Sequence, residues 1–170
     1  MIENARLRKA ALFCLFLLAG GVLSACMKFE LQYDFLQYHY YNGFAFWNNR
    51  LGVDLAPAFI PTFYNPLLDA VMYALMSVLK QHVTIYCFIQ GLWFGALMYL
   101  AFKISALYFD LTTRSGKVFA CISLLICATG TATWFQMGTA THETELAVLT
   151  VGAFYLLLRD NKRFFAAGLL

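Results

Sequence analysis

The longest polar segment of this sequence holds most of the side chains that could do chemistry. It covers residues 34–69, lies between two apolar stretches and contains all three prolines of the chain. Its charged and imidazole side chains are Asp34, His39, Arg50, Asp54 and Asp69. Polar groups set between apolar segments are typical of a membrane protein that works at the membrane surface.

Asp34 is the candidate general base of this segment. A carboxylate in a partly dry loop is more basic than one in water, which suits it to accept a proton at neutral pH. Asp34, Tyr38 and Tyr41 are spaced i, i+4 and i+7, so one helix face would carry a carboxylate followed by two phenols. The alternative is that Asp34 is a helix cap or a solvated acid, and that the tyrosines belong to an aromatic belt at the membrane interface.

His39 and Arg50 are the candidates for binding an anion in the same segment. Either could contact a phosphate, and Arg50 could do so bidentately. Asp54 lies four residues after Arg50. The alternative is therefore a local ion pair between these two side chains, or contact of Arg50 with lipid headgroups.

A second, shorter polar segment has the spacing of a metal site. Residues 136–145 read QMGTATHETE and place His142 three residues before Glu145, with Glu143 between them. On the first turn of a helix, His142, Glu143 and Glu145 could ligate a divalent metal ion, which is the one cofactor that the sequence suggests. The alternative is that Thr141 caps the helix and both glutamates complement its dipole.

The composition indicates a polytopic membrane protein. The 170 residues are 62% hydrophobic and 12% charged, with a mean hydropathy of +0.67, whereas soluble domains carry about 25% charged residues. The net charge of +3 gives no indication of a nucleic-acid partner. None of the five cysteines forms a C-x-x-C pair, which argues against a cysteine metal cluster. We therefore expect an all-α fold built from membrane-spanning helices.

The apolar stretches divide the chain into spans and loops of a single membrane domain. We expect spans at residues 10–27, 83–109, 118–135 and 146–158, and residues 164–170 begin a further apolar segment. Residues 28–82 and 136–145 then form two loops that carry the polar segments. Because the chain stops inside an apolar run, we expect it to be the N-terminal part of a longer protein.

Two interfacial helices are expected in the first loop. The first covers residues 34–47 and ends at the turn-forming residues 48–52. In the second, Asn65 can act as the cap and Pro66 occupies the first helical position, with Asp69 near the positive end of the dipole. Because residues 66–79 are few for a span, this helix should lie in the interface or tilt.

The positive residues orient the spans. Three basic residues precede the first span and place the N-terminus in the cytoplasm, in what we expect to be a bacterial plasma membrane. If residues 66–79 rest on the outer face, the basic connectors at 110–117 and 159–163 both fall inside and both polar loops fall outside. If they cross, the connector at 159–163 falls outside. Residues 23–26 also match a lipoprotein cleavage box, which is the alternative to the uncleaved first span that we expect.

The layout of the first polar segment resembles that of a known enzyme family. Asp34 is followed by YHYYN, then by NNR-LGVD, then by FYNPLLD leading into an apolar helix. This order is similar to the first outer loop of the GT-C-fold glycosyltransferases, which include the PMT/ArnT-like families. The similarity extends over residues 1–158. In the ArnT-like branch a lysine often precedes the Pro-Leu pair, and Tyr64-Asn65 stands in its place here.

The resemblance implies a GT-C-like helix bundle that transfers a sugar from a polyprenyl-phosphate donor to an acceptor at the outer membrane face. Its partners would be the lipid-linked donor and membrane lipid, with no nucleic acid. Asp34 would be catalytic, and the substrate-binding candidates are Tyr38, His39, Tyr41, Arg50 and Asp54. The alternatives are a non-catalytic or truncated relative that keeps the loop as a binding surface, and a transporter component.

Overall fold

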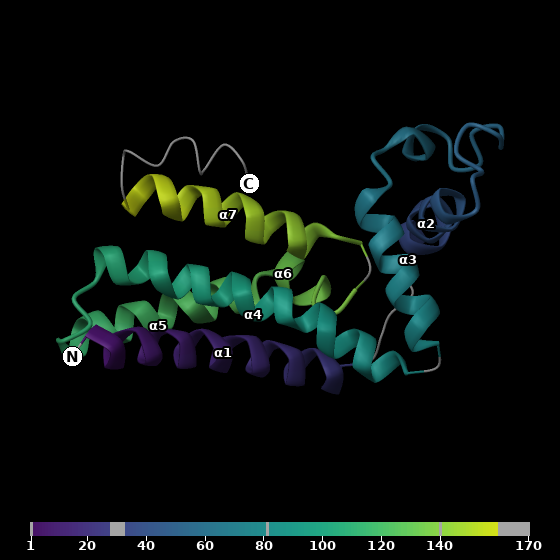
Figure 1. The fold of residues 1–170 in the computed structure, drawn as a ribbon. Helices are drawn as coiled ribbons and strands as arrows, with labels where there is room; N and C mark the ends of the chain where they lie inside the picture. The colour runs from purple at the N-terminus through teal and green to yellow at the C-terminus, as the bar shows by residue number, and fades with distance from the viewer. Residues whose placement is uncertain (1, 28–32, 81, 140, 160–170) are drawn as a thin grey trace.

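The computed structural model describes residues 2–27, 33–80, 82–139 and 141–159, and helices account for most of them. No strand occurs among these residues, so the expected all-α fold is confirmed for this part of the chain. In chain order the helices are α1 (Ile2–Cys26), the π-helical turn η1 (Phe35–His39), α2 (Tyr40–Trp47), the 3-10 turn η2 (Ile60–Phe63), α3 (Leu67–Leu79), α4 (Val83–Tyr108), α5 (Arg114–Thr129), α6 (Thr131–Phe135) and α7 (Glu143–Arg159) (Figure 1).

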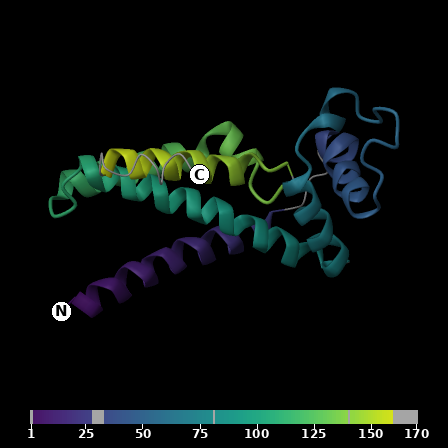
Figure 2. The same ribbon diagram turned by 45° about the horizontal axis from the view of Figure 1, so that its top comes forward.

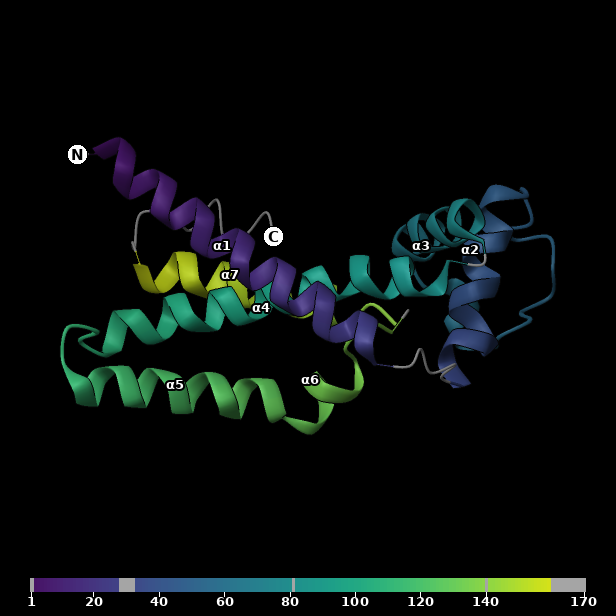
Figure 3. The same cartoon turned by 90° about the horizontal axis from the view of Figure 1, so that it is seen from below.

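The long helices form an elongated bundle, and the described residues of the first loop form a smaller unit at one end. Helices α4, α5 and α7 run side by side along the bundle, while α2 and α3 lie beyond its end (Figures 1 and 3). Figure 2 shows α1 diverging from α4 toward the N-terminus. Within the described residues, two helical stretches are long and apolar enough to cross a membrane, by length and composition: Arg6–Cys26, with a mean hydropathy of 2.0, and Val83–Tyr108, with 1.6.

Glycines let α1 and α4 approach each other closely. Gly91 and Gly95 lie one turn apart on α4, and a methyl group on Gly95 would come within 2.3 Å of the α1 backbone. Small residues spaced in this way are typical of helices that pack against each other in membranes. At one end of the contact, the Ser24 hydroxyl donates a hydrogen bond to the backbone oxygen of Cys87 (2.7 Å).

One expected span is divided between two helices. Within residues 118–135, α5 ends at Thr129, Gly130 has φ −54° and ψ 132°, and α6 begins at Thr131. A glycine between two β-branched threonines has low helix propensity, which explains the break. The expected span at 146–158 lies within α7, and residues 164–170 are outside the described residues.

Helix α3 begins at Leu67, one residue later than the sequence predicts, and Pro66 is its N-cap residue. The side-chain oxygen of Asn65 still accepts a hydrogen bond from the backbone N–H of Leu67 (3.0 Å) at this helix start. The helix runs crosswise to α4 in Figure 1 and is seen nearly end-on in Figure 3. A buried cluster of Phe35, Met72 and Tyr86 packs η1 and α3 against the start of α4. The first loop is therefore held in a fixed place at the end of the bundle.

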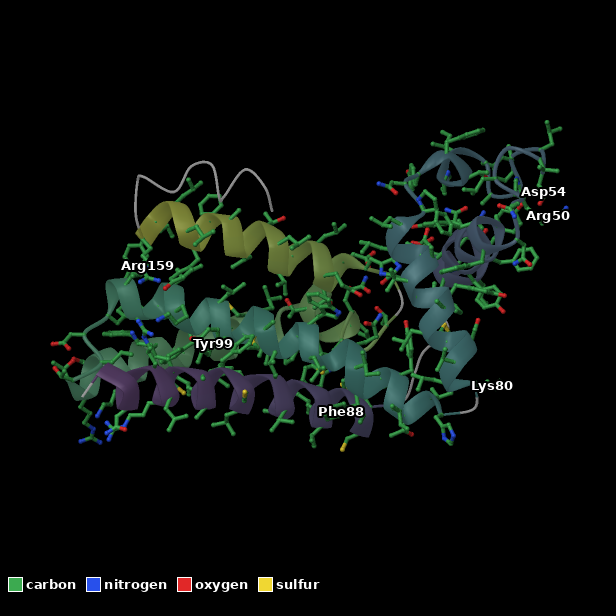
Figure 4. All side chains as sticks on the ribbon, in the orientation of Figure 1. Arg50, Asp54, Lys80, Phe88, Tyr99 and Arg159 are labelled. Carbon is green, nitrogen blue, oxygen red and sulfur yellow. The ribbon has the colours of Figure 1, made fainter. Side chains whose placement is uncertain are left out.

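The basic connector at 110–117 and the described residues of the polar loops lie at opposite ends of the bundle. The start of α1, the end of α4, the start of α5 and the end of α7 gather at one end (Figure 1). Arg159 lies at this end in Figure 4, whereas Arg50 and Asp54 lie at the other. Both polar segments therefore share one end of the molecule.

Candidate functional site

A buried carboxylate connects the two polar segments. Asp69, in the first turn of α3, is 4% exposed. Nδ1 of His39, at the end of η1, lies 2.7 Å from Oδ1 of Asp69 and is hydrogen-bonded to it. Nε2 of His142, the residue before α7, lies 3.1 Å from the same oxygen. We refer to His39, Asp69 and His142 as the His–Asp–His cluster.

The π-helical turn sets the direction of the side chains around His39. The backbone N–H of Tyr40 bonds to the oxygen of Phe35, the i→i+5 pattern of a π-helix. This wider turn changes the angle between successive side chains around the helix axis from its value in an α-helix. Tyr38 consequently lies beside His39, with ring centroids 4.2 Å apart, whereas Tyr41 contacts Asp54 instead.

The second polar segment holds His142 in an uncommon backbone conformation. Its φ is +66°, in the left-handed region, where histidine is more frequent than most non-glycine residues. Side chains brace the segment: the Thr141 hydroxyl donates to Oε1 of Gln136 (2.6 Å), and the Gln90 amide of α4 donates to the backbone oxygen of Thr139 (3.3 Å). Strained residues of this kind occur preferentially at functional sites.

Glu145 approaches His142 from the side opposite Asp69. Its Oε1 lies 3.4 Å from Nδ1 of His142, so the two ring nitrogens each face a carboxylate. The imidazoles of His39 and His142 meet edge to face, with centroids 5.2 Å apart and an interplanar angle of 85°. All four side chains are buried.

Two imidazole nitrogens of the cluster have no hydrogen-bond partner among the described residues. They are Nε2 of His39 and Nε2 of His142. The 3.1 Å contact of the His142 nitrogen with Asp69 has the distance of an ion pair but not the geometry of a hydrogen bond. Buried polar atoms without a hydrogen bond are rare in proteins, so each requires an explanation.

Charge governs the ionisation of the cluster. Burial lowers the pKa of His142, but the carboxylates of Asp69 and Glu145 outweigh this effect and raise its pKa to about 9. Burial raises the pKa of Asp69, but His142 and His39 outweigh it and hold that pKa below its usual value. In the protein alone, the cluster therefore pairs an ionised carboxylate with a protonated His142 at neutral pH.

The cluster forms part of the wall of a cleft of about 440 Å³. The cleft is also lined by Tyr38, Tyr64 and Glu143, and no lysine or arginine of the described part of the chain lines it. Burial, followed by the charges of Asp34 and Glu143, raises the pKa of Tyr38. Acids from both polar segments therefore lie near this phenol, although Asp34 is not itself part of the lining.

Three of the predicted substrate-binding residues form a separate group. The Nε of Arg50 donates to Oδ2 of Asp54 (2.8 Å), and the hydroxyl of Tyr41 donates to the same oxygen. These bonds, with that from Arg50 the stronger influence, lower the pKa of Asp54 to about 2. The local ion pair expected as the alternative for Arg50 is confirmed. None of the three residues lines the cleft, whereas Tyr38 and His39 do.

The remaining predicted residues surround the cluster. Asp34 immediately precedes η1, is exposed and makes no capping bond. Of the predicted metal ligands, His142 belongs to the cluster, Glu145 contacts His142, and Glu143 lines the cleft. Thr141, which was the alternative cap for α7, donates its hydroxyl to Gln136.

Sequence reasoning missed the central role of Asp69. The sequence places it in the first turn of a helix, which suggests only an interaction with the helix dipole. Its histidine partners are distant in the chain, and His39 lies 30 positions before Asp69. The available signal was an acid inside an apolar run, because such an acid usually has a buried partner.

No family model, curated protein or solved structure matches the chain. The chemistry of the site is therefore argued from its own geometry.

Proposed function

We propose that this protein is a GT-C-like membrane glycosyltransferase that moves a sugar from a polyprenyl-phosphate donor to an acceptor hydroxyl at the outer membrane face. The observation that carries the proposal is that both polar segments meet at one acid-bordered cleft. The phenol of Tyr38 lies within the electrostatic influence of Asp34 from the first segment and Glu143 from the second. Carboxylates that gather around a phenol of the cleft suit a reaction that deprotonates an acceptor.

The arrangement of the helices supports placing this cleft at the outer surface. With α1 and α4 as spans, the basic residues at one end of the bundle would face the cytoplasm, as the positive-inside rule requires. The cleft then opens on the opposite side. Helix α3, which runs crosswise to α4, would lie along the interface rather than cross the membrane.

In the proposed reaction, Asp34 accepts the proton of the acceptor hydroxyl. The hydroxyl oxygen forms a bond to the anomeric carbon of the sugar, and the bond between that carbon and the phosphate oxygen breaks. The polyprenyl phosphate leaves with the electron pair of the broken bond. The rings of Tyr38 and Tyr64, which meet edge to face with centroids 6.1 Å apart, give the sugar an aromatic wall.

The test compares sugar transfer by membranes that contain equal amounts of wild-type protein and Asp34→Asn. The substitution keeps the shape of the side chain but removes its basicity, so turnover should fall by about 10²-fold or more. Asp110→Asn is the matched control, because Asp110 is an exposed acid in the connector after α4, and its turnover should not change.

Equal turnover of Asp34→Asn and wild type would remove Asp34 from the mechanism. A wild-type protein that binds polyprenyl-phosphate sugars but transfers none of them would overturn the enzymatic proposal. That result would favour the alternative of a non-catalytic binding module.

A further inference from the structure

The His–Asp–His cluster has the composition and spacing of a metal site. Each of the three residues offers one ligand atom, and these atoms lie within 4.8 Å of one another. The residues come from η1, α3 and the loop before α7, and each is more than nine-tenths buried, with exposures of 8%, 4% and 6% for His39, Asp69 and His142. A surface group of acids would show neither this convergence nor this burial.

A nitrogen without a hydrogen-bond partner indicates a ligand at the same place. Nε2 of His142 is buried, lacks a hydrogen-bond partner among the described residues and faces Asp69, whereas His39 faces Asp69 through Nδ1. The 3.1 Å contact between His142 and Asp69 brings a nitrogen and a carboxylate oxygen together without hydrogen-bond geometry. A cation that is bound by both atoms accounts for this arrangement.

We propose that His39, Asp69 and His142 bind a divalent transition-metal ion, and that Zn²⁺ is the best match. Two imidazoles and one carboxylate suit zinc and similar ions, whereas calcium and magnesium prefer sites made wholly of oxygen. Ligand atoms about 2 Å from a tetrahedral ion lie about 3.3 Å apart. The observed separations from Asp69 Oδ1 are 3.1 Å to Nε2 of His142 and 2.7 Å to Nδ1 of His39, so these two separations would lengthen by about 0.2 to 0.6 Å on binding.

Glu145 acts through His142 in this arrangement and does not bind the ion. Its carboxylate faces Nδ1 of His142, whereas Nε2 faces Asp69. A carboxylate behind a metal-binding histidine fixes the ring and makes it a better ligand. The proposed set of metal ligands differs from the one expected from the sequence, because His39 and Asp69 replace Glu143 and Glu145.

The ion would be reachable from the cleft, because all three ligands belong to the cleft lining. Three protein ligands leave a fourth position for water or substrate, as in catalytic zinc sites. Among the described residues the lining contains no lysine or arginine, so the ion would provide positive charge for a phosphate group there. This last role rests on the proposed glycosyl transfer, whereas metal binding itself does not.

The test measures metal bound to the intact, detergent-purified protein. After removal of metal with a chelator and titration with Zn²⁺, the wild-type protein should bind one equivalent, measured by elemental analysis. His39→Gln and Asp69→Asn should each reduce the affinity at least tenfold. His82→Gln is the matched control, because His82 is the one histidine of the sequence outside the cluster and is exposed. The zinc affinity of this variant should equal that of wild type.

Cobalt distinguishes direct ligation from a structural effect of these substitutions. With Co²⁺ in place of Zn²⁺, the wild-type protein should show the visible absorption of a four-coordinate ion. His142→Cys should still bind cobalt and should gain a thiolate-to-cobalt band in the near ultraviolet, which appears only when residue 142 contacts the ion.

Three results would overturn the metal site: no zinc uptake by wild type, equal uptake by wild type and His39→Gln, or His142→Cys binding cobalt without the thiolate band. These readouts do not depend on activity. A protein that binds zinc but transfers no sugar would support the metal site and contradict the proposed function. A protein that transfers sugar but binds no zinc would support the proposed function and contradict the metal site.

Discussion

Gly43 is the position at which a single methyl group should most directly disturb the site. It lies on α2, one turn after His39, where α2 crosses α3. A Cβ atom there would lie 2.4 Å from the backbone oxygen of Asp69 and 2.6 Å from Cβ of Tyr73. Because the first neighbour is backbone rather than a flexible side chain, the helices themselves must move apart.

The size of this movement follows from the contact distances. Ordinary van der Waals contact begins at 3.4 Å, so relief of the 2.4 Å contact requires about 1.0 Å of separation. Carried to the Asp69 carboxylate, this shift would lengthen the 2.7 Å bond from His39 beyond the range of a hydrogen bond. Overpacking costs about 1–3 kcal/mol, and the better helix propensity of alanine offsets about 1 kcal/mol of it.

The assay compares the unfolding midpoint and the zinc affinity of wild type, Gly43→Ala and Gly130→Ala. We expect Gly43→Ala to be destabilised by up to about 2 kcal/mol, and its zinc affinity to fall about tenfold or more. Gly130→Ala is the control, because its added Cβ would meet its neighbours at 3.4–3.6 Å. If Gly43→Ala were more stable than wild type and bound zinc equally well, the close approach of α2 and α3 would not be what assembles the site.

Two further predictions concern the membrane arrangement and the first loop. Reporter fusions after Gly52 and Thr139 should both report the outer side and a fusion after Ser115 the cytoplasm; a cytoplasmic signal at Thr139 would separate the loops. Asp54→Asn should speed tryptic cleavage after Arg50, because it weakens the ion pair, and equal cleavage rates would contradict this. Since the pKa of Asp54 is lowered from 3.8 to about 2, the pair should persist at neutral pH and be lost only as the pH falls from about 4 to about 2, which carboxyl NMR can follow.

The parts of the fold that depend on local sequence could be predicted. Long apolar runs identify α1 and α4, because hydrophobic length alone makes a candidate span. The start of α3 follows to within one residue from Asn65 and Pro66, and the pairing of Arg50 with Asp54 follows from their i, i+4 spacing. In each case the residues that determine the feature lie within a few positions of one another.

The assembly of the site could not be predicted, because it depends on contacts between distant segments. Asp69 meets His39 only because α2 and α3 pack together, and meets His142 only because that residue adopts a positive φ. The π-helical turn at Phe35–His39 also leaves no clear sequence signal, yet it decides which side chains of the segment reach the cleft. Periodicity at the α-helical spacing therefore grouped Tyr38 with Tyr41, which the structure separates.

The most direct test of the account is a double-mutant cycle of sugar transfer with Asp34→Asn, Glu143→Gln and the double variant. If both polar segments serve one site, the two acids act on the same bound substrate and their effects are not independent. Glu143→Gln lowers the turnover of the wild-type protein by some factor. Added to Asp34→Asn, the same substitution should lower turnover by a much smaller factor. Effects that simply multiply would show that the two segments act separately, and would contradict a shared site.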